Sequence, residues 1–341
     1  MKAVILNEAG GVENLQFTEI EKPMISDNEV LVKVISISIN PVDVKARGYE
    51  GVLNWIFEDK RPVILGWDIS GEVIETGKNV TEFKTGDEVF GMVNFFGSGK
   101  AYAEYVAAPA AHLALKPENT THQQAAAAAM AASTAYQALV HVAKIKQGDK
   151  VLIHAASGGV GHMAVQIAKH FGGYVIGVSS AKNRNFVLSS GADEHIDYTT
   201  ENFRDKLQNI DVVIDTIQGE TLQDSVDVVR RHGIIVTLPS PEIPEEVKTK
   251  AEQKKVNIEF MMVESQTKTI REISDLLKKT ILKPAVYKTF SFEDIRNAHL
   301  EVETNHVVGK VIVNIKKTRP EIISGLVNKI KCNLSLRERI I

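Results

Sequence analysis

The sequence predicts an α/β protein in which a β-rich domain is joined to a doubly wound parallel-sheet domain. Residues 1–120 carry short apolar runs separated by frequent glycines, a pattern typical of short strands with tight turns. From residue 149 onward, apolar strand-like runs alternate with helix-like runs. Such alternation indicates a parallel sheet with right-handed crossovers.

The first domain contains short apolar runs such as 30–39 and 63–74, and strands of this length with frequent turns predict a twisted or barrel-like antiparallel domain. The segment 122–140 is rich in alanine, which favours a helix and lets neighbouring backbone approach closely. We therefore expect a buried helix that connects the two domains.

The second domain is predicted from a repeated unit of strand, turn and helix. Strand-like runs lie at 151–155, 174–180, 211–216 and 234–239, and the helix-like runs between them include one at 222–233. A helix-like stretch at 269–282 follows, and 286–313 returns to strand-like and short helical segments. The expected layout is a parallel-sheet domain at 124–265 inserted into a first domain made of 1–123 and 266–341.

The final residues, 315–341, are rich in lysine and arginine, and apolar residues recur at helical spacing in 322–330. We expect this tail to pack on its own domain or on a sister subunit. A basic helix on a membrane surface is the alternative.

Composition narrows the class of protein. The chain has 341 residues, 44% of them hydrophobic, and a formal net charge of -3. This balance predicts a cytoplasmic globular protein with small-molecule ligands, no nucleic-acid partner and no membrane span. A single cysteine, Cys332, excludes an internal disulfide and a metal site built on several thiolates.

A glycine-rich turn stands between an apolar strand and an amphipathic helix. It consists of Ser157, Gly158, Gly159, Val160 and Gly161. Glycines at such a turn let the backbone approach a pyrophosphate, and the N–H groups that open the helix bind its oxygens. The motif departs from G-x-G-x-x-G, because an alanine holds the first position. A glycine-rich turn of another α/β fold is the alternative to a dinucleotide site.

The next strand indicates which dinucleotide binds. An acidic residue at its end would accept the ribose hydroxyl of NAD, but here the strand ends with Ser179 and Ser180, followed by Lys182. Hydroxyls and a cation suit a 2′-phosphate, so the sequence predicts NADPH. Tyr198 is expected to close the same pocket. Alternatively, Lys182 and Arg184 are only solvated residues at the start of a helix.

Taken together, these motifs resemble the medium-chain dehydrogenase/reductase superfamily, and specifically its zinc-independent, zeta-crystallin-like quinone oxidoreductase branch. The resemblance covers about residues 1–314 and rests on a series of motifs in order. These are Asn40-Pro41-Val42-Asp43, Gly66-Trp67-Asp68, Gly86-Asp87-Glu88-Val89, Ala101-Tyr102-Ala103-Glu104-Tyr105, Ala132-Ser133-Thr134-Ala135-Tyr136, the glycine turn and Gly309-Lys310-Val311. The resemblance implies a GroES-like catalytic domain beside a Rossmann domain, and a homodimer or homotetramer.

The same resemblance implies that no metal takes part. Zinc ligands of related alcohol dehydrogenases would fall where Asn40, Trp67 and Met130 stand, and none of these is such a ligand. Hydride transfer to a quinone or an enone does not need the alkoxide that zinc stabilises.

Three residues are implied to act on the substrate. Asn40 is expected to donate a hydrogen bond to the substrate carbonyl, Asp43 to order the loop, and Thr134 to touch the nicotinamide. The alternative for residues 40–43 is a plain turn, since asparagine, proline and aspartate favour turns.

The resulting hypothesis is an NADPH-dependent reductase of quinones or α,β-unsaturated carbonyls. Two alternatives remain open from the sequence: a zinc-less enzyme of the alcohol dehydrogenase type, and a crystallin-like or regulatory protein that binds NADPH and reduces substrates only incidentally.

Overall fold

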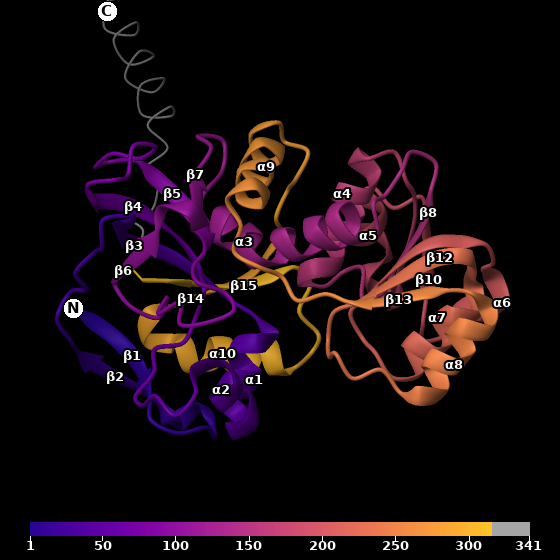
Figure 1. Ribbon diagram of the computed structural model, residues 1–341, viewed down its shortest axis with the longest axis horizontal. Helices are drawn as coiled ribbons and strands as arrows, with labels where there is room; N and C mark the ends of the chain where they lie inside the picture. The colour runs from indigo at the N-terminus through magenta and orange to yellow at the C-terminus, as the bar shows by residue number, and fades with distance from the viewer. Residues whose placement is uncertain (316–341) are drawn as a thin grey trace, which may run out of the picture.

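The computed structural model describes residues 1–315, which form two sheets that lie side by side (Figure 1). A mostly antiparallel seven-stranded sheet occupies one half, and a parallel six-stranded sheet occupies the other. Helix α3 (His122–Tyr136) runs between them. The predicted α/β class, with a β-rich domain beside a doubly wound sheet, is therefore confirmed.

The first sheet has the order β14-β15-β3-β4-β5-β7, with β6 paired to β3. Its strands are β3 (Glu29–Ile39), β4 (Asp68–Thr76), β5 (Glu88–Met92), β6 (Tyr105–Pro109), β7 (Leu113–Leu115), β14 (Val286–Ser291) and β15 (Lys310–Asn314). A separate hairpin consists of β1 (Lys2–Leu6) and β2 (Leu15–Glu19). Segments from the two ends of the chain thus share one sheet.

Residues 40–43 begin a helix rather than a simple turn. Helix α1 (Pro41–Gly48) has proline in its first turn, where a missing N–H costs nothing, and α2 (Glu50–Phe57) follows it directly. Asp43 Oδ2 accepts the backbone N–H of Asn40 at 2.8 Å, which closes the start of α1. The asparagine side chain is left for other contacts.

The second sheet has the order β10-β9-β8-β11-β12-β13, and every neighbouring pair is parallel. Its strands are β8 (Lys150–Ile153), β9 (Tyr174–Ser179), β10 (Glu194–Asp197), β11 (Ile210–Asp215), β12 (Val229–Thr237) and β13 (Asn257–Phe260). The strand order reverses between β8 and β11. In doubly wound sheets ligands bind at this point, beyond the carboxyl ends of the strands.

Of the helices that follow, the first five pack around the parallel sheet and the last two pack on strands of the seven-stranded sheet. They are α4 (Gly159–His170), α5 (Arg184–Ser189), α6 (Phe203–Lys206), α7 (Glu220–Val228), α8 (Glu245–Lys254), α9 (Thr267–Lys278) and α10 (Ile295–Glu303). The expected helix at 222–233 ends early, because β12 begins at Val229.

Helix α3 is buried on all sides, as its alanines predict. Each alanine from Ala125 to Ala132 is at most 2% exposed. The helix packs on β3, β4, β5 and β15 of one sheet and on α4 of the other. Such close approach needs side chains no larger than methyl groups at most contacts. The helix then continues as a wider π-helical segment, Gln137–Val142.

The strand ranges fall on either side of the predicted boundaries at 124 and 265, and we keep these boundaries as a proposal because α3 packs both on the seven-stranded sheet and on α4 of the other half. The predicted basic tail lies outside the described residues, apart from Ile315. Within residues 1–315, no helix is long and apolar enough to cross a membrane.

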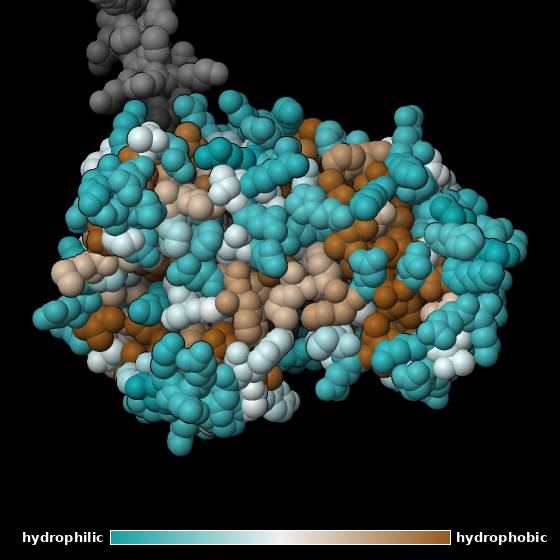
Figure 2. Space-filling view, in the orientation of Figure 1, coloured by the Kyte–Doolittle hydropathy of each residue, from teal (hydrophilic) through white to brown (hydrophobic). Residues whose placement is uncertain are grey.

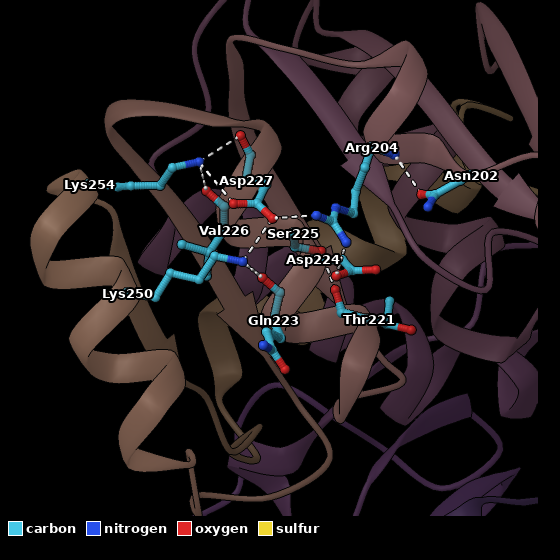
Figure 3. A network of polar contacts seen from close by, with 10 residues as sticks. All are labelled: Asn202, Arg204, Thr221, Gln223, Asp224, Ser225, Val226, Asp227, Lys250 and Lys254. Carbon is cyan, nitrogen blue, oxygen red and sulfur yellow. Dashed lines mark hydrogen bonds and ion pairs between the residues drawn. The ribbon is translucent and has the colours of Figure 1, made fainter.

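A network of charges fixes α8 onto α7 (Figure 3). The Asp227 carboxylate accepts from Lys250 at 2.8 Å and Lys254 at 3.1 Å, and it pairs with Arg204 at 3.2 Å. These ion pairs hold the two helices together on the outer side of the sheet, so we assign the cluster a structural role.

Candidate functional site

The predicted glycine turn follows β8 and opens α4. Gly158 precedes the helix, and no side chain caps the helix and no acidic residue stands in its first turn. The first N–H groups of α4, which begin at Gly159 and Val160, therefore remain available for an anion. A Cβ on Gly161 would overlap the carbonyl oxygen of Ala155, so only glycine fits there.

The alanine that replaces the first glycine of the motif sits in ordinary backbone. The positive φ of the turn falls instead on Ala155, at 46°. Ala156 is fully buried and its side chain faces Gly177 of the neighbouring strand. An alanine can therefore hold the first position of the motif, because Ala155 and not Ala156 takes the positive φ of the turn.

The turn is tied to the catalytic side of the molecule by backbone contacts. The Gly309 N–H donates to Ser157 O at 2.9 Å. His162, in the first turns of α4, donates from Nδ1 to Gly158 O at 2.7 Å and accepts the Ala285 N–H on Nε2 at 3.1 Å. Burial lowers the pKa of this histidine to about 4, so it is neutral and holds that single tautomer.

The residues predicted for the 2′-phosphate meet at the ends of β9 and β10. The Ser179 hydroxyl contacts His195 Nε2 at 2.8 Å, and Tyr198 donates its N–H to Ser179 O at 3.4 Å while its ring is 61% exposed. Asn183 joins Ser157 Oγ and Ser180 Oγ, at 3.0 and 3.4 Å. The structure thus brings Ser157, Ser179, Ser180 and Tyr198 together.

Lys182 follows these serines in a single exposed turn. Sequence reasoning assigned no role to Asn183, although it is the side chain that spans the two serines. It also missed Asp197, which lies beside Ser179 in the neighbouring strand. This carboxylate accepts the Ala181 N–H at 3.0 Å and the Thr199 hydroxyl at 2.8 Å, so it is engaged with its own loop.

A buried polar cluster lies beneath the junction of the two sheets. Asn40, which is 3% exposed, donates from Nδ2 to Asp68 Oδ2 at 2.9 Å and accepts the Lys310 ammonium on Oδ1. Asp68 Oδ1 accepts the Met130 N–H of α3 at 2.9 Å, and Lys310 Nζ also donates to Ile39 O at 3.2 Å. The cluster joins β3, β4, α3 and β15.

A second branch of the cluster starts at Asp43. Its Oδ1 accepts the Tyr102 hydroxyl at 2.9 Å, and that hydroxyl lies 2.9 Å from His299 Nε2. Both side chains are fully buried. Since the hydroxyl has one proton and donates it to Asp43, it accepts from the histidine.

Burial dominates the ionisation of this cluster. It raises the pKa of Asp68 to about 7 and that of Asp43 to about 6, although the Lys310 charge opposes both shifts. Burial likewise lowers the pKa of Lys310, against the pull of the two carboxylates. The pKa of His299 falls to about 3 because the ring is buried, with Arg47 adding to the effect.

Thr134, the third residue implied to act on the substrate, lies one turn beyond Met130 on α3. Its hydroxyl donates to Met130 O at 2.8 Å, and the residue is 8% exposed. The structure therefore places Thr134 on the helix that supplies the Asp68 contact, with its hydroxyl oxygen free to accept a further bond.

Aromatic rings lead from the buried cluster to the surface. Trp67 contacts Phe57 and Phe95, with ring centroids 6.2 and 5.3 Å apart, and Phe95 contacts Phe96 at 5.5 Å. Phe96 contacts Trp55, which is 56% exposed, with the ring centroids 4.4 Å apart and the ring planes tilted by 53°. These rings form an apolar wall beside the polar cluster.

The three positions where zinc ligands would fall hold Asn40, Trp67 and Met130. The Asn40 amide is bound to Asp68 and Lys310, and neither Trp67 nor Met130 is a residue type that binds zinc. Among residues 1–315, no group of three or more His, Cys, Asp or Glu side chains is arranged to hold a metal. The donor set at this site is thus one amide, two carboxylates and an ammonium.

The parallel sheet and its glycine turn define a protein of the dinucleotide-binding class. Comparison with family models adds two matches: "Alcohol dehydrogenase GroES-like domain" at residues 26–118 and "Zinc-binding dehydrogenase" at 190–313. The first segment contains strands of the seven-stranded sheet. The second contains β10 to β13 of the six-stranded sheet together with β14 and most of β15 of the seven-stranded sheet.

Curated relatives extend over most of the chain. The chloroplastic NADPH-dependent alkenal/one oxidoreductase of Arabidopsis thaliana is 33% identical, covering 92% of this chain and 79% of the relative. Quinone oxidoreductase of Sus scrofa is 31% identical and covers 92% and 97%. The solved quinone oxidoreductase of Coxiella burnetii superposes with a TM-score of 0.86 at 34% identity, covering 93% and 99%.

The chain therefore belongs to the medium-chain dehydrogenase/reductase superfamily, in the branch of quinone oxidoreductases and alkenal reductases. It is an oxidoreductase, and the family resemblance seen in its motifs is confirmed.

Proposed function

We propose that this protein is an NADPH-dependent reductase that transfers hydride to quinones or α,β-unsaturated carbonyls. The observation that carries the proposal is the uncapped glycine turn of α4 next to the buried Asn40 cluster, since Lys310 touches both. A Cβ on Gly159 would lie 2.9 Å from Lys310 Cδ, and the ammonium of the same side chain binds Asn40. The names of the relatives from Arabidopsis and pig support the same activity.

The residues present fit a phosphorylated dinucleotide. In this proposal the turn Ser157–Gly161 offers N–H groups to the pyrophosphate, and Ser179, Ser180, Lys182 and Tyr198 are the residues expected around a 2′-phosphate. When bound, NADPH supplies the hydride. The protein then has to orient the acceptor and stabilise the charge that develops on its oxygen.

We assign that stabilisation to Asn40. Its Nδ2 carries two hydrogens, one of which it donates to Asp68, and we propose that the other binds the carbonyl oxygen of the acceptor. Asp43 orders the start of α1, and the hydroxyl of Thr134 faces the nicotinamide in this proposal. The rings of Trp55 and Phe96 provide an apolar approach suited to flat acceptors.

The first test follows the oxidation of NADPH and NADH with a panel of quinones, enals and enones. Turnover of at least one of these classes with NADPH is expected. Binding of NADPH without turnover of any acceptor would contradict the proposal and favour a binding or regulatory protein. Activity that depends on added zinc would favour an enzyme of the alcohol dehydrogenase type.

A second test replaces Asn40 by alanine. Because removal of one donor to a developing oxyanion lowers kcat by about 100-fold or more, we expect a loss of that order with little change in the Kd for NADPH. Wild-type turnover in Asn40→Ala would show that the amide is not the donor.

We also propose a homodimer or homotetramer in the cytoplasm. Strand β13 ends the six-stranded sheet, with Ile258 and Phe260 half-buried, and apolar surface gathers to the right of centre in Figure 2, around where Figure 1 draws α5 and β13. Light scattering gives the oligomeric state. Cell fractionation tests the location, since the Arabidopsis relative is named as chloroplastic.

A further inference from the structure

We infer that Asp68 and Lys310 are positioning residues that hold the amide of Asn40 in a single orientation. Asp68 accepts from the amide nitrogen at 2.9 Å, and the Lys310 ammonium donates to the amide oxygen. This inference rests on the proposed function, because it concerns the donor that we assign to the acceptor's carbonyl.

Charge makes the orientation one-sided. If the amide of Asn40 rotated by 180°, its N–H₂ group would face an ammonium and its oxygen would face a carboxylate. Hydrogen bonds to charged groups are stronger than those between neutral groups, and both would be lost. The two neighbours therefore determine which atom of the amide points at each side of the pocket.

Both positioning side chains are themselves fixed from several elements. Asp68, which is fully buried, uses its second oxygen to accept the Met130 N–H from α3 at 2.9 Å. Lys310, which is 4% exposed, also donates to Ile39 O at 3.2 Å, and its stem lies beside Gly159. The amide is thus held by the seven-stranded sheet and α3, and through the Lys310 stem it lies next to the glycine turn.

The arrangement also strengthens the proposed donor. An ammonium on the amide oxygen draws electron density from the nitrogen and makes the remaining N–H a better donor. The carboxylate opposite keeps the nitrogen from turning away. Asp43, the other acid near Lys310, is engaged by the Asn40 N–H and the Tyr102 hydroxyl. The Asn40 side chain also hydrogen-bonds Asp43, and this contact opposes the rise in the pKa of that carboxyl.

The test is a double-mutant cycle measured in steady-state turnover of the full-length protein with an accepted quinone or enone. Asp68→Asn keeps the shape but removes the charge. We expect it to lower kcat by about 10-fold or more in the wild-type background, and by less than about 2-fold in Asn40→Ala, because groups that act as a unit are non-additive. The Kd for NADPH should stay unchanged.

Ser70→Ala provides the matched control. Ser70 is fully buried in the same strand and bonds to Val89 O at 3.1 Å and His122 Nδ1 at 2.8 Å, away from Asn40. A buried hydrogen bond is lost there without any effect on the amide, so kcat should stay at the wild-type value. This separates positioning from loss of stability.

Additive effects of Asp68→Asn and Asn40→Ala would overturn the inference, and so would a loss of NADPH affinity that accounts for the whole effect. If Asp68→Asn does not fold, Lys310→Met enters the same cycle with the same expectation. Failure of the proposed function itself looks different, since the wild-type protein would then turn over no acceptor.

Discussion

At the scale of single residues, the choice of cofactor depends on a few side chains at the end of β9. Ser180 presents a hydroxyl that Asn183 reaches at 3.4 Å, and Lys182 adds a positive charge. The acid of this region, Asp197, is bound to the Ala181 N–H and to Thr199. Hydrogen bonds from Thr199 lower the pKa of this carboxyl, which keeps it ionised and committed to the loop.

The variant Ser180→Asp should therefore change the cofactor preference. A carboxylate at this position accepts the ribose hydroxyls of NADH and repels the roughly two negative charges of a 2′-phosphate. We expect the ratio of kcat/KM for NADPH over NADH to fall by about 10-fold or more, since like charges brought together cost several kcal/mol.

The matched control is Ser189→Asp, which adds the same charge on the exposed side of α5, where the serine hydroxyl bonds Phe186 O. An unchanged cofactor ratio in Ser180→Asp, or an equal change in Ser189→Asp, would show that this serine does not contact the phosphate.

The residues of the site were accessible from sequence to unequal degrees. Asn40 and Asp43 lie in one short motif, so their proximity was predicted. Asp68 and Lys310 were only parts of family motifs, because their contact with Asn40 joins positions 28 and 270 residues away. No local pattern signals such a meeting; it arises when β3, β4 and β15 align in one sheet.

At the scale of elements, apolar periodicity identified the strands and helices of the parallel sheet, and alanine content identified α3. Helix ends were less accessible. The helix expected at 222–233 ends at Val228, because Val229 already belongs to β12 and pairs with Ile210 of β11. The sequence suggested only a plain turn at residues 40–43 and did not predict helix α1, because a turn and the start of a helix favour the same residue types.

The charge network of Figure 3 allows a test of how α7 and α8 are held together. Asp227→Asn removes the acceptor shared by Lys250 and Lys254. We expect the free energy of unfolding to fall by about 1 kcal/mol at low ionic strength, and by less at high salt, since the network is partly solvated. Denaturant unfolding measures this change, and turnover should be unaffected.

The control for that experiment is Glu252→Gln, an exposed residue of α8 that forms no ion pair with any residue of 1–315. An equal loss of stability in this variant would mean that the net charge of the helix matters, rather than the contacts of Asp227.

At the scale of the whole molecule, folding buries several ionisable groups and so couples stability to pH. Burial lowers the pKa of His154 and His162 to about 4 and that of His299 to about 3. As the pH falls below about 6.5, these histidines become protonated in the unfolded chain but stay neutral in the folded protein, which lowers stability. Asp43 and Asp68 act in the opposite sense, because their raised pKa values let the folded protein bind protons first.

We therefore expect stability to fall as the pH drops from about 6.5 to 4, since three histidines, with a slope of up to about 1.4 kcal/mol per pH unit each, outweigh two carboxyls. Asp68→Asn removes one opposing group and should steepen the fall. Denaturant unfolding across this range measures both slopes. A wild-type protein that gains stability on acidification, or a flatter curve in the variant, would contradict this account.

Helix α3 limits how such a protein can diversify. Because its buried alanines lie between the seven-stranded sheet and α4, any larger side chain there would push apart the two halves that meet around Asn40. Changes in substrate specificity are therefore expected at exposed residues such as Trp55 and Phe96, because their rings can be replaced without moving the buried interior. The sequence of α3 is thus constrained by packing, whereas the exposed residues near the site can change and alter substrate specificity.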